Sequence, residues 1–207
     1  MPLKLAKHHT LADWDFNIGE GSYSLSPTHF VSSPTSLLFR DPAINLITII
    51  VLCRIPGTQC LPQGEVRTWL RAYENFLGLA NFRNQAALGT ADYWNCYYIY
   101  IIGTEIRLYR WVAGAYSLRD TGTGSIFVNQ WVHYRVFWYN GKTPGEVEAL
   151  CVDVYREVAG EWVKEGDTLY DVSNWFKDSE INRAGPFGRC YKTNSLYCDD
   201  TEIWGPV

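Results

Sequence analysis

Several features that would point directly to a function are missing from this sequence. It has no run of Lys or Arg, and its formal net charge of -4 and pI near 5.6 argue against a groove that follows nucleic-acid phosphates. Its longest largely apolar stretch, residues 44–53, contains Asn45 and Thr48 and is too short to cross a bilayer. No internal repeat or low-complexity segment is visible. We therefore expect no nucleic-acid partner and no membrane insertion.

The sequence also lacks the marks of secretion and of a cysteine scaffold. Residues 1–16 contain no apolar segment and no small-residue cleavage site, so we expect no signal peptide and synthesis in the cytoplasm. The six cysteines form no C-x-x-C pattern, which favours free buried thiols over a zinc or redox site. Local disulfides between Cys53 and Cys60 and between Cys190 and Cys198 are the alternative.

Apolar and aromatic residues, in contrast, are abundant. They make up 47% and 15% of the chain, with nine Trp and fourteen Tyr, which is enough to bury a core. A length of 207 residues suits one domain, so we expect a single domain over residues 1–207 with residues 1–12 as an N-terminal extension. Aromatic side chains that the core does not use can stack on sugar rings.

The clearest strand pattern is a long hairpin over residues 129–156. Both of its strands carry apolar residues at every second position, and the turn 140–145 contains an Asn-Gly and a Pro-Gly pair. Such a ribbon needs a facing sheet to be stable. Further strands are predicted at 14–18, 22–25, 28–31, 36–40, 44–54, 65–73, 93–102, 105–112, 114–120, 161–170, 186–191 and 196–204, with one helical turn in 171–176. The sequence thus predicts an all-β fold: a single antiparallel β-sandwich of the jelly-roll type, with at most one short helical turn.

The late part of the chain resembles the concanavalin A-like lectin/glucanase superfamily. The motifs that carry the resemblance are Asn129-Gln130-Trp131-Val132-His133-Tyr134-Arg135-Val136, the strand at 150–155, Gly160-Glu161-Trp162, and the closing Asp199-Asp200-Thr201-Glu202-Ile203-Trp204. These are signatures of fold more than of function. The resemblance implies two curved antiparallel sheets that bind carbohydrate on the concave face or on the rim loops.

The motifs of the enzymes in this superfamily are incomplete here. Its laminarinase-type hydrolases carry E-x-D-x-x-E on one strand, which sets a nucleophile and an acid at the spacing that retention requires, and no such run occurs in this chain. Its alginate-lyase branch uses R-x-E-x-R, whereas Arg67-Thr68-Trp69-Leu70-Arg71 has Trp69 in place of the carboxylate. Gln130 and His133 are spaced differently from the Gln-x-His of that branch, and its late tyrosine has no match. The sequence therefore favours a protein that is not an enzyme.

Two predicted strands carry Arg and aromatic residues at alternate positions, the pattern of a surface that can bind sugars. Rings can stack on sugar faces, and guanidinium groups can bind hydroxyls or carboxylates. We expect these residues to line one concave face, with His133 and Arg135 of the long hairpin joining them; the alternative is a solvated or partner-covered sheet face, and for His133 a hydrogen-bonded sheet residue. The predicted carbohydrate-binding residues are Arg67, Trp69, Arg71, Tyr73, Arg107, Tyr109, Trp111 and His133.

A structural calcium site is a further hypothesis. Related domains often hold calcium where the first and last strands meet, and Glu20, Asp199 and Asp200 would supply the hard oxygen ligands that this ion prefers. The alternative is that all three are ordinary turn and edge carboxylates. No other cofactor is expected.

Jelly rolls serve both as lectins and as capsid components. The leading hypothesis is therefore a non-enzymatic carbohydrate-recognition or structural surface module, displayed as a decoration or appendage protein on a virus or phage particle. Its partners would be a glycan and other subunits of that assembly. The first alternative is a glycan-cleaving enzyme of the same fold, a glycoside hydrolase or polysaccharide lyase. The second is a structural assembly protein without a ligand.

Overall fold

The computed structural model describes residues 3–7, 14–18, 22–31, 35–40, 47–53, 63–84, 95–112, 115–173, 183–190 and 195–205. Every regular element in these ranges is a β-strand, and every strand pair is antiparallel. None of the described residues forms a helix with the length and hydropathy to cross a bilayer. The predicted all-β antiparallel fold is confirmed.

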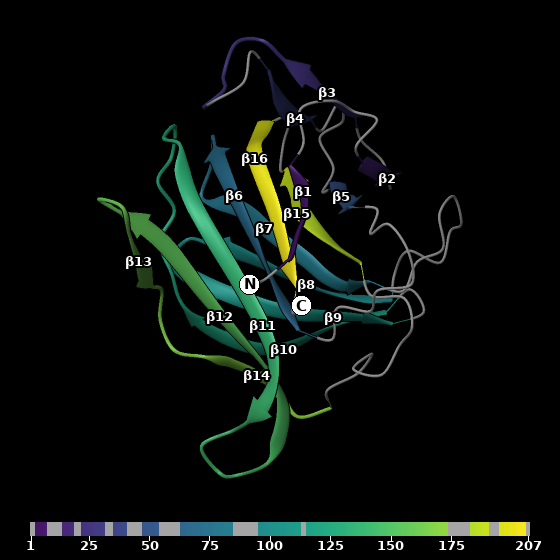
Figure 1. Cartoon of the computed structure of the whole chain (residues 1–207), viewed down its shortest axis with the longest axis vertical. Helices are drawn as coiled ribbons and strands as arrows, with labels where there is room; N and C mark the ends of the chain where they lie inside the picture. The colour runs from purple at the N-terminus through teal and green to yellow at the C-terminus, as the bar shows by residue number, and fades with distance from the viewer. Residues whose placement is uncertain are drawn as a thin grey trace.

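The described strands form two sheets, of nine and seven strands. In sheet order, the nine-stranded sheet contains β13 (Glu161–Lys164), β12 (Glu148–Val158), β11 (Val132–Lys142), β6 (Gly64–Ala72), β16 (Ser195–Gly205), β4 (Ser36–Arg40) and β3 (Ser22–Ser26), with β1 (Leu3–Lys7) beside β16 and β14 (Leu169–Asp171) beside β12. The seven-stranded sheet contains β10 (Ala115–Thr123), β9 (Glu105–Val112), β8 (Cys96–Ile102), β7 (Phe76–Asn84), β15 (Arg183–Cys190), β5 (Ile47–Cys53) and β2 (Trp14–Ile18). In Figure 1 the strands β6, β11, β12 and β16 cross in front of β8, β9 and β10.

The core lies between the two sheets and is built by alternating side chains from both. Tyr134, Val136 and Trp138 of β11 point inward, and all three are buried. The ring of Trp138 stacks on Phe82 of β7 in the opposite sheet, with centroids 5.0 Å apart. Truncating buried rings of this kind costs about 3–5 kcal/mol, so this contact is one of the main links between the layers.

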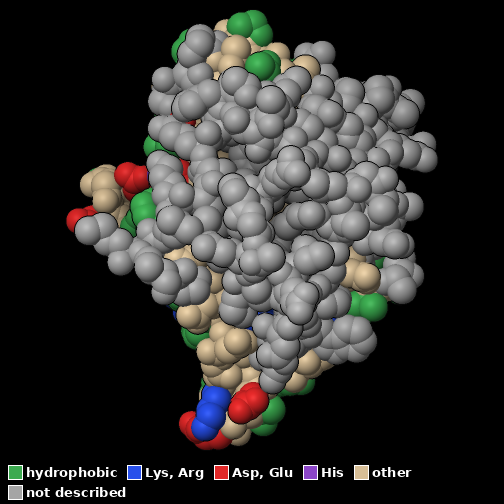
Figure 2. All heavy atoms as spheres, turned by 45° about the vertical axis from the view of Figure 1, so that its right-hand side comes forward, with side chains coloured by type: hydrophobic (Ala, Val, Ile, Leu, Met, Phe, Trp, Pro, Cys, Tyr) green, Lys and Arg blue, Asp and Glu red, His purple; other side chains and the backbone are tan. Residues whose placement is uncertain are grey.

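The predicted hairpin is formed by β11 and β12. Val136 pairs with Val154 and Trp138 with Val152, so the inward residues of the two strands lie opposite one another. A Cβ on Gly141 would lie 2.8 Å from the sulfur of Cys151, so a larger residue there would force the Cys151 side chain to move. Acidic and basic side chains lie together at the lower tip of Figure 2, where Figure 1 places the turn of this hairpin.

Strand β7 is absent from the predicted strands, although it lies in the middle of its sheet between β8 and β15. Its sequence, FLGLANFRN, does not alternate between apolar and polar residues. The register against β8 shifts between Gly78 and Ala80, and such an irregularity breaks the period of two. Leu77, Leu79 and Phe82 are nevertheless buried.

Three other predicted elements differ from the structure. Residues 28–31 form bends and not a strand. The single strand predicted at 161–170 is two strands, β13 and β14, separated near Gly166, whose φ is +66°. The helical turn predicted at 171–176 does not begin at Asp171, which ends β14; residues 174–176 lie outside the described ranges.

Two further expectations concern the termini and the thiols. Within the predicted N-terminal extension, Leu3–Lys7 forms β1 and pairs with β16.

Cys96, Cys151 and Cys198 are free and buried, as expected for free thiols, and burial raises the pKa of Cys198 to about 12. A disulfide between Cys190 and Cys198 is therefore wrong. The alternative pairing of Cys53 involves residue 60, which lies outside the described residues.

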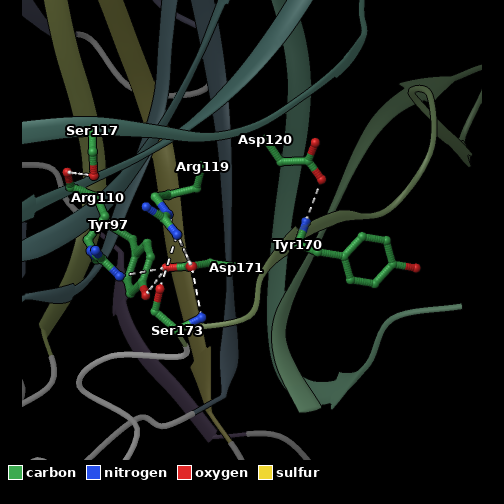
Figure 3. A network of polar contacts seen from close by, with 8 residues as sticks. All are labelled: Tyr97, Arg110, Ser117, Arg119, Asp120, Tyr170, Asp171 and Ser173. Carbon is green, nitrogen blue, oxygen red and sulfur yellow. Dashed lines mark hydrogen bonds and ion pairs between the residues drawn. The ribbon is translucent and has the colours of Figure 1, made fainter. Parts of the chain in front are cut away.

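A buried carboxylate joins the two sheets at one end of the core (Figure 3). Asp171 of β14 accepts hydrogen bonds from the hydroxyl of Tyr97 at 2.6 Å, from Nη1 of Arg110 at 3.2 Å and from Nε of Arg119 at 3.1 Å. The three donors lie on β8, β9 and β10 of the seven-stranded sheet, whereas β14 belongs to the other sheet. The side chain of Asp171 is completely buried, so its charge depends on these partners.

Candidate functional site

The structure divides the predicted carbohydrate-binding residues between two sheets. In β6 the inward residues are Val66, Leu70 and Ala72, which belong to the core, so the alternate residues point away from it. In β9 the core residues are Ile106 and Leu108. The single face predicted for the eight residues is therefore wrong: Arg67, Trp69, Arg71, Tyr73 and His133 lie on the outer face of the nine-stranded sheet, and Arg107, Tyr109 and Trp111 lie on the outer face of the seven-stranded sheet.

Register places the polar and aromatic residues of the first face in rows across the strands. Trp69 of β6 pairs with His133 of β11 and, on its other side, with Asp199 of β16. Arg67 pairs in the same way with Arg135 and Glu202. Neighbouring residues in such rows have Cβ atoms about 5 Å apart, which brings two arginines, two carboxylates and several rings into one patch.

A buried ion-pair network holds the arginines of this patch. Glu65, which is 5% exposed, forms an ion pair with Arg67 through Oε1 and accepts a hydrogen bond from Nε of Arg135, 2.5 Å away, through Oε2. Charge-assisted hydrogen bonds of this kind are stronger than neutral ones. Both guanidinium groups are therefore fixed in place on the sheet.

Beside this network lies a cavity of about 280 Å³. The guanidinium of Arg67 lies 4.8 Å from the ring centroid of Trp204, and that of Arg135 lies 5.5 Å from the ring centroid of Phe137. The Nε of Arg67 is buried and has no hydrogen-bond partner in the part of the chain that the structure describes. The cavity is lined by Gln63, Gly64, Glu65, Arg67, Arg135, Phe137, Trp204 and Gly205.

The neighbouring row is a stack of aromatic rings. Trp69 lies parallel to His133 with centroids 4.7 Å apart, and Trp162 of β13 contacts the same imidazole at 4.8 Å. Nδ1 of His133 lies 2.6 Å from a carboxylate oxygen of Glu157. Burial lowers the pKa of His133, although the hydrogen bond to Glu157 acts in the opposite direction. At neutral pH the imidazole is therefore neutral and donates its Nδ1 proton to Glu157.

The far end of this face is covered by the bend at residues 28–31. Nη1 of Arg71 donates to Nδ1 of His29 at 3.0 Å, and the hydroxyl of Tyr73 lies 3.0 Å from Nε2 of the same ring. Because Arg71 can only donate, Nδ1 of His29 is the acceptor, and Nε2 carries the proton in the neutral ring. Arg71 and Tyr73 are thus occupied by His29, which leaves the cavity end of the face as the more accessible part.

The predicted calcium ligands are only partly described. Asp199 is buried and accepts from the backbone N–H of Val31 at 2.6 Å and of Asp200 at 2.9 Å. Asp200 lies in a bulge of β16 with a φ of +44°, and Glu20 lies outside the described residues. The described ranges contain no cluster of three or more metal-binding side chains, so this calcium site stays a prediction.

The outer face of the seven-stranded sheet holds a different aromatic cluster. Tyr98 and Tyr100 of β8 are 2% and 4% exposed, and both stack on Tyr109, at 5.4 and 5.3 Å. Trp111 contacts Tyr116 of β10 at 5.6 Å. These rings mostly bury one another, and Tyr116, which is 65% exposed, is the member that is most open to a ligand.

Sequence reasoning missed three rings of the first face: Phe137, Trp162 and Trp204. The alternation that places His133 and Arg135 on one face of β11 also places Phe137 there, so the sequence could have predicted this ring. Trp162 and Trp204 join the patch only because β13 and β16 occupy their places in the sheet, and that order is not encoded in any local pattern.

No family model matches the chain, and no curated protein matches its sequence. Solved structures of similar shape include the marine PL-14 alginate lyase from Aplysia kurodai, with a TM-score of 0.55 and 11% identity over 89% of this chain and 87% of that one. The carbohydrate binding module CBM66 from Bacillus subtilis has a TM-score of 0.48 and 12% identity over 91% and 95% of the two chains. The alginate lyase vAL-1 from Chlorella virus has a TM-score of 0.46 and 10% identity over 94% of each. At 11% identity the likeness to the Aplysia kurodai lyase concerns the fold alone: the chain has the antiparallel β-sandwich, or jelly-roll, fold.

Proposed function

We propose that the protein is a non-enzymatic carbohydrate-recognition module that binds a glycan on the outer face of its nine-stranded sheet. The cavity beside Glu65 carries this proposal. It combines two fixed guanidinium groups with the rings of Phe137 and Trp204. Aromatic rings stack on the apolar faces of sugars, and guanidinium groups donate to their hydroxyls or carboxylates.

Its surroundings extend this binding surface along the sheet. Trp69, His133 and Trp162 form the half-buried stack of the next row, and the Glu157 carboxylate fixes the orientation of the imidazole. Ligand sites commonly consist of apolar and aromatic walls with a few fixed polar groups. A rigid face also loses little conformational freedom when a ligand binds.

Recognition fits the described carboxylates of this face better than cleavage does. Glycoside hydrolysis requires one carboxyl group as an acid and a second as a nucleophile or base. Here Glu65 is held by two arginines, Glu157 by His133, and Asp153 by Lys164 at 2.7 Å. Glu202 accepts from Nε1 of Trp204 at 3.1 Å, and Asp199 accepts from two backbone N–H groups. Each of these carboxylates already has a partner within the protein, which supports a positioning role over an acid–base pair.

Glycan-array screening followed by calorimetry with the best ligand tests the proposal. Trp204→Ala should weaken binding about tenfold, because it removes a stacking ring, whereas Trp204→Phe should retain most of the affinity. Tyr116→Ala, on the opposite face, is the matched control and should bind like the wild type. A screen without any bound glycan, or equal affinity in Trp204→Ala, would contradict the proposal.

A glycan-cleaving enzyme of the same fold is the alternative. The observation that favours it is the pattern of Arg67 and Arg71 on one strand face beside His133. Incubation with polysaccharides, followed by assays for new reducing ends and for unsaturated products, distinguishes the two. Turnover of any substrate would replace the recognition module with an enzyme.

We also infer that the chain is a divergent member of the concanavalin A-like superfamily, since its hairpin β11–β12 and its closing strand β16 lie in one curled sheet, as the sequence motifs imply. Its display on a virus or phage particle stays a prediction. Co-sedimentation of the chain with intact particles at a fixed stoichiometry would test it, and binding to particles without any glycan affinity would support the structural alternative.

A further inference from the structure

A second hollow lies at the other end of β6 from the cavity described above. Glu65 lies near the start of β6, whereas Asn75 follows its end and borders this hollow. Three separate chain segments meet there: the β6–β7 turn, the β8–β9 turn and the segment after β10. The hollow has a volume of about 320 Å³ and is lined by Asn75, Gly103, Thr104, Ser125, Ile126 and Phe127.

Backbone hydrogen bonds tie these segments together. The N–H of Gly103 donates to the carbonyl of Asn75 at 2.9 Å, and the N–H of Gly124 donates to the carbonyl of Thr104 at 3.0 Å. The carbonyl of Ser125 accepts from the hydroxyl of the buried Tyr134 at 2.8 Å. The hollow is therefore part of the folded framework and does not need a ligand to form.

Its apolar wall is fixed in a similar way. Ile126 packs against the core, and the guanidinium of Arg156 lies 4.6 Å from the ring centroid of Phe127. Arg156 is itself held by Glu165 through a bond of 2.8 Å. Phe127 consequently presents a ring of defined orientation beside the hollow.

The polar side chains around the hollow are unengaged. The amide of Asn75 and the hydroxyls of Thr104 and Ser125 have no hydrogen-bond partner among the described residues. None of the six lining residues carries a charge. An amide and two hydroxyls can both donate and accept, which matches a neutral molecule with several hydroxyl groups, while the apolar wall matches the C–H face of a sugar ring.

We propose that this hollow is a second binding site, which takes a single neutral sugar residue. Its size falls within the range of small-molecule pockets, and its uncharged lining separates it from the arginine-bearing cavity on the sheet. The site does not depend on the function proposed for that cavity.

The test is a titration of isotope-labelled protein with methyl glucoside, methyl galactoside and methyl mannoside, followed by NMR. The backbone amides of Gly103 and Ser125 should shift for at least one of them. Thr104→Val, which removes the hydroxyl but keeps the shape, should weaken this binding about three- to tenfold, whereas Thr104→Ser should retain it. Added salt should leave the affinity nearly unchanged, because the lining residues and the three sugars are uncharged.

Trp204→Ala should leave these shifts intact, which separates this site from the proposed glycan face. The proposal is overturned if none of the three sugars shifts the amides of Gly103 and Ser125. It is also overturned if Thr104→Val binds as tightly as the wild type.

Discussion

The outer faces of the two sheets carry similar sequence patterns in different surroundings. Strand β6 reads Glu65-x-Arg67-x-Trp69, and strand β9 reads Glu105-x-Arg107-x-Tyr109. In each strand the glutamate pairs with the arginine two residues later. On β6, however, the side chain of Glu65 is 7% exposed and also binds Arg135 of the next strand, whereas on β9 the side chain of Glu105 is 40% exposed and the pair is local.

The aromatic rings on the two outer faces also differ in their surroundings. On the nine-stranded sheet Trp69 stacks on an imidazole that a carboxylate holds, and charged groups alternate with rings along the rows. On the seven-stranded sheet Tyr98 and Tyr100 are buried against Tyr109. Similar residue types therefore give different surfaces because the neighbouring strands differ. On the nine-stranded sheet, charged groups hold the rings in an accessible patch, whereas on the seven-stranded sheet most of the rings bury one another.

The largest expected effect on stability concerns Asp171, the buried carboxylate that joins the two sheets. Asp171→Asn should lower the free energy of unfolding by about 3–5 kcal/mol, since it removes the charge that Arg110 and Arg119 share in a buried site. Urea denaturation measures the loss. Hydrogen exchange should then show faster opening both in β6 and β11 and in β9 and β10.

The pH dependence of this contribution follows from the environment of Asp171. Burial raises its pKa, but hydrogen bonds from Tyr97 and Ser173 and the charge of Arg119 outweigh burial, so the pKa is lower than normal. A carboxyl group whose pKa is lower in the folded state stabilises the fold at pH values above its unfolded pKa of about 4. This stabilisation is lost as the pH falls from that value through the lower pKa of the folded state. Asp171→Asn should flatten the stability curve in that acid range, and an unchanged curve would contradict this assignment.

The paired glutamates give the next largest effect and test the comparison directly. Glu65→Gln should cost about 2–3 kcal/mol, because a buried carboxylate that binds two arginines is lost. Glu105→Gln should cost less than about 1 kcal/mol, because its ion pair is exposed and screened. Parallel urea titrations measure both variants. Equal losses would show that the two patterns are energetically alike and would remove the distinction between the faces.

Sequence alone was sufficient for the fold class and for the two strands of the central hairpin. The alternation in β6 correctly separates Arg67 and Trp69 from the core residues Val66 and Leu70, because a period of two assigns sides within one strand. It does not show which sheet a strand joins. The eight predicted residues were therefore placed on one face, and β7, whose bulge at Gly78 hides the period, was not found.

A smaller effect is expected from His133 on the nine-stranded sheet. Burial lowers its pKa, so the folded state resists protonation while the unfolded imidazole, with a pKa near 6.5, accepts a proton. Stability should therefore fall as the pH drops below about 6.5, by at most about 1.4 kcal/mol per pH unit. Urea titrations of the wild type and His133→Gln at several pH values measure this slope. An identical slope in the variant would show that another group is responsible.

The smallest effect should come from Tyr116, the exposed ring of the other face. Tyr116→Ala removes ring contacts to Tyr109 and Trp111 and should cost about 0.5–1 kcal/mol, since exposed aromatic pairs contribute little more. Tyr116→Phe keeps the ring and should be neutral, because no hydrogen bond of its hydroxyl is present among the described residues. Thermal unfolding of both variants provides the measurement. A loss above about 2 kcal/mol would mean that Tyr116 is packed like Tyr98 and Tyr100, and that the aromatic cluster of the seven-stranded sheet extends to its edge strand.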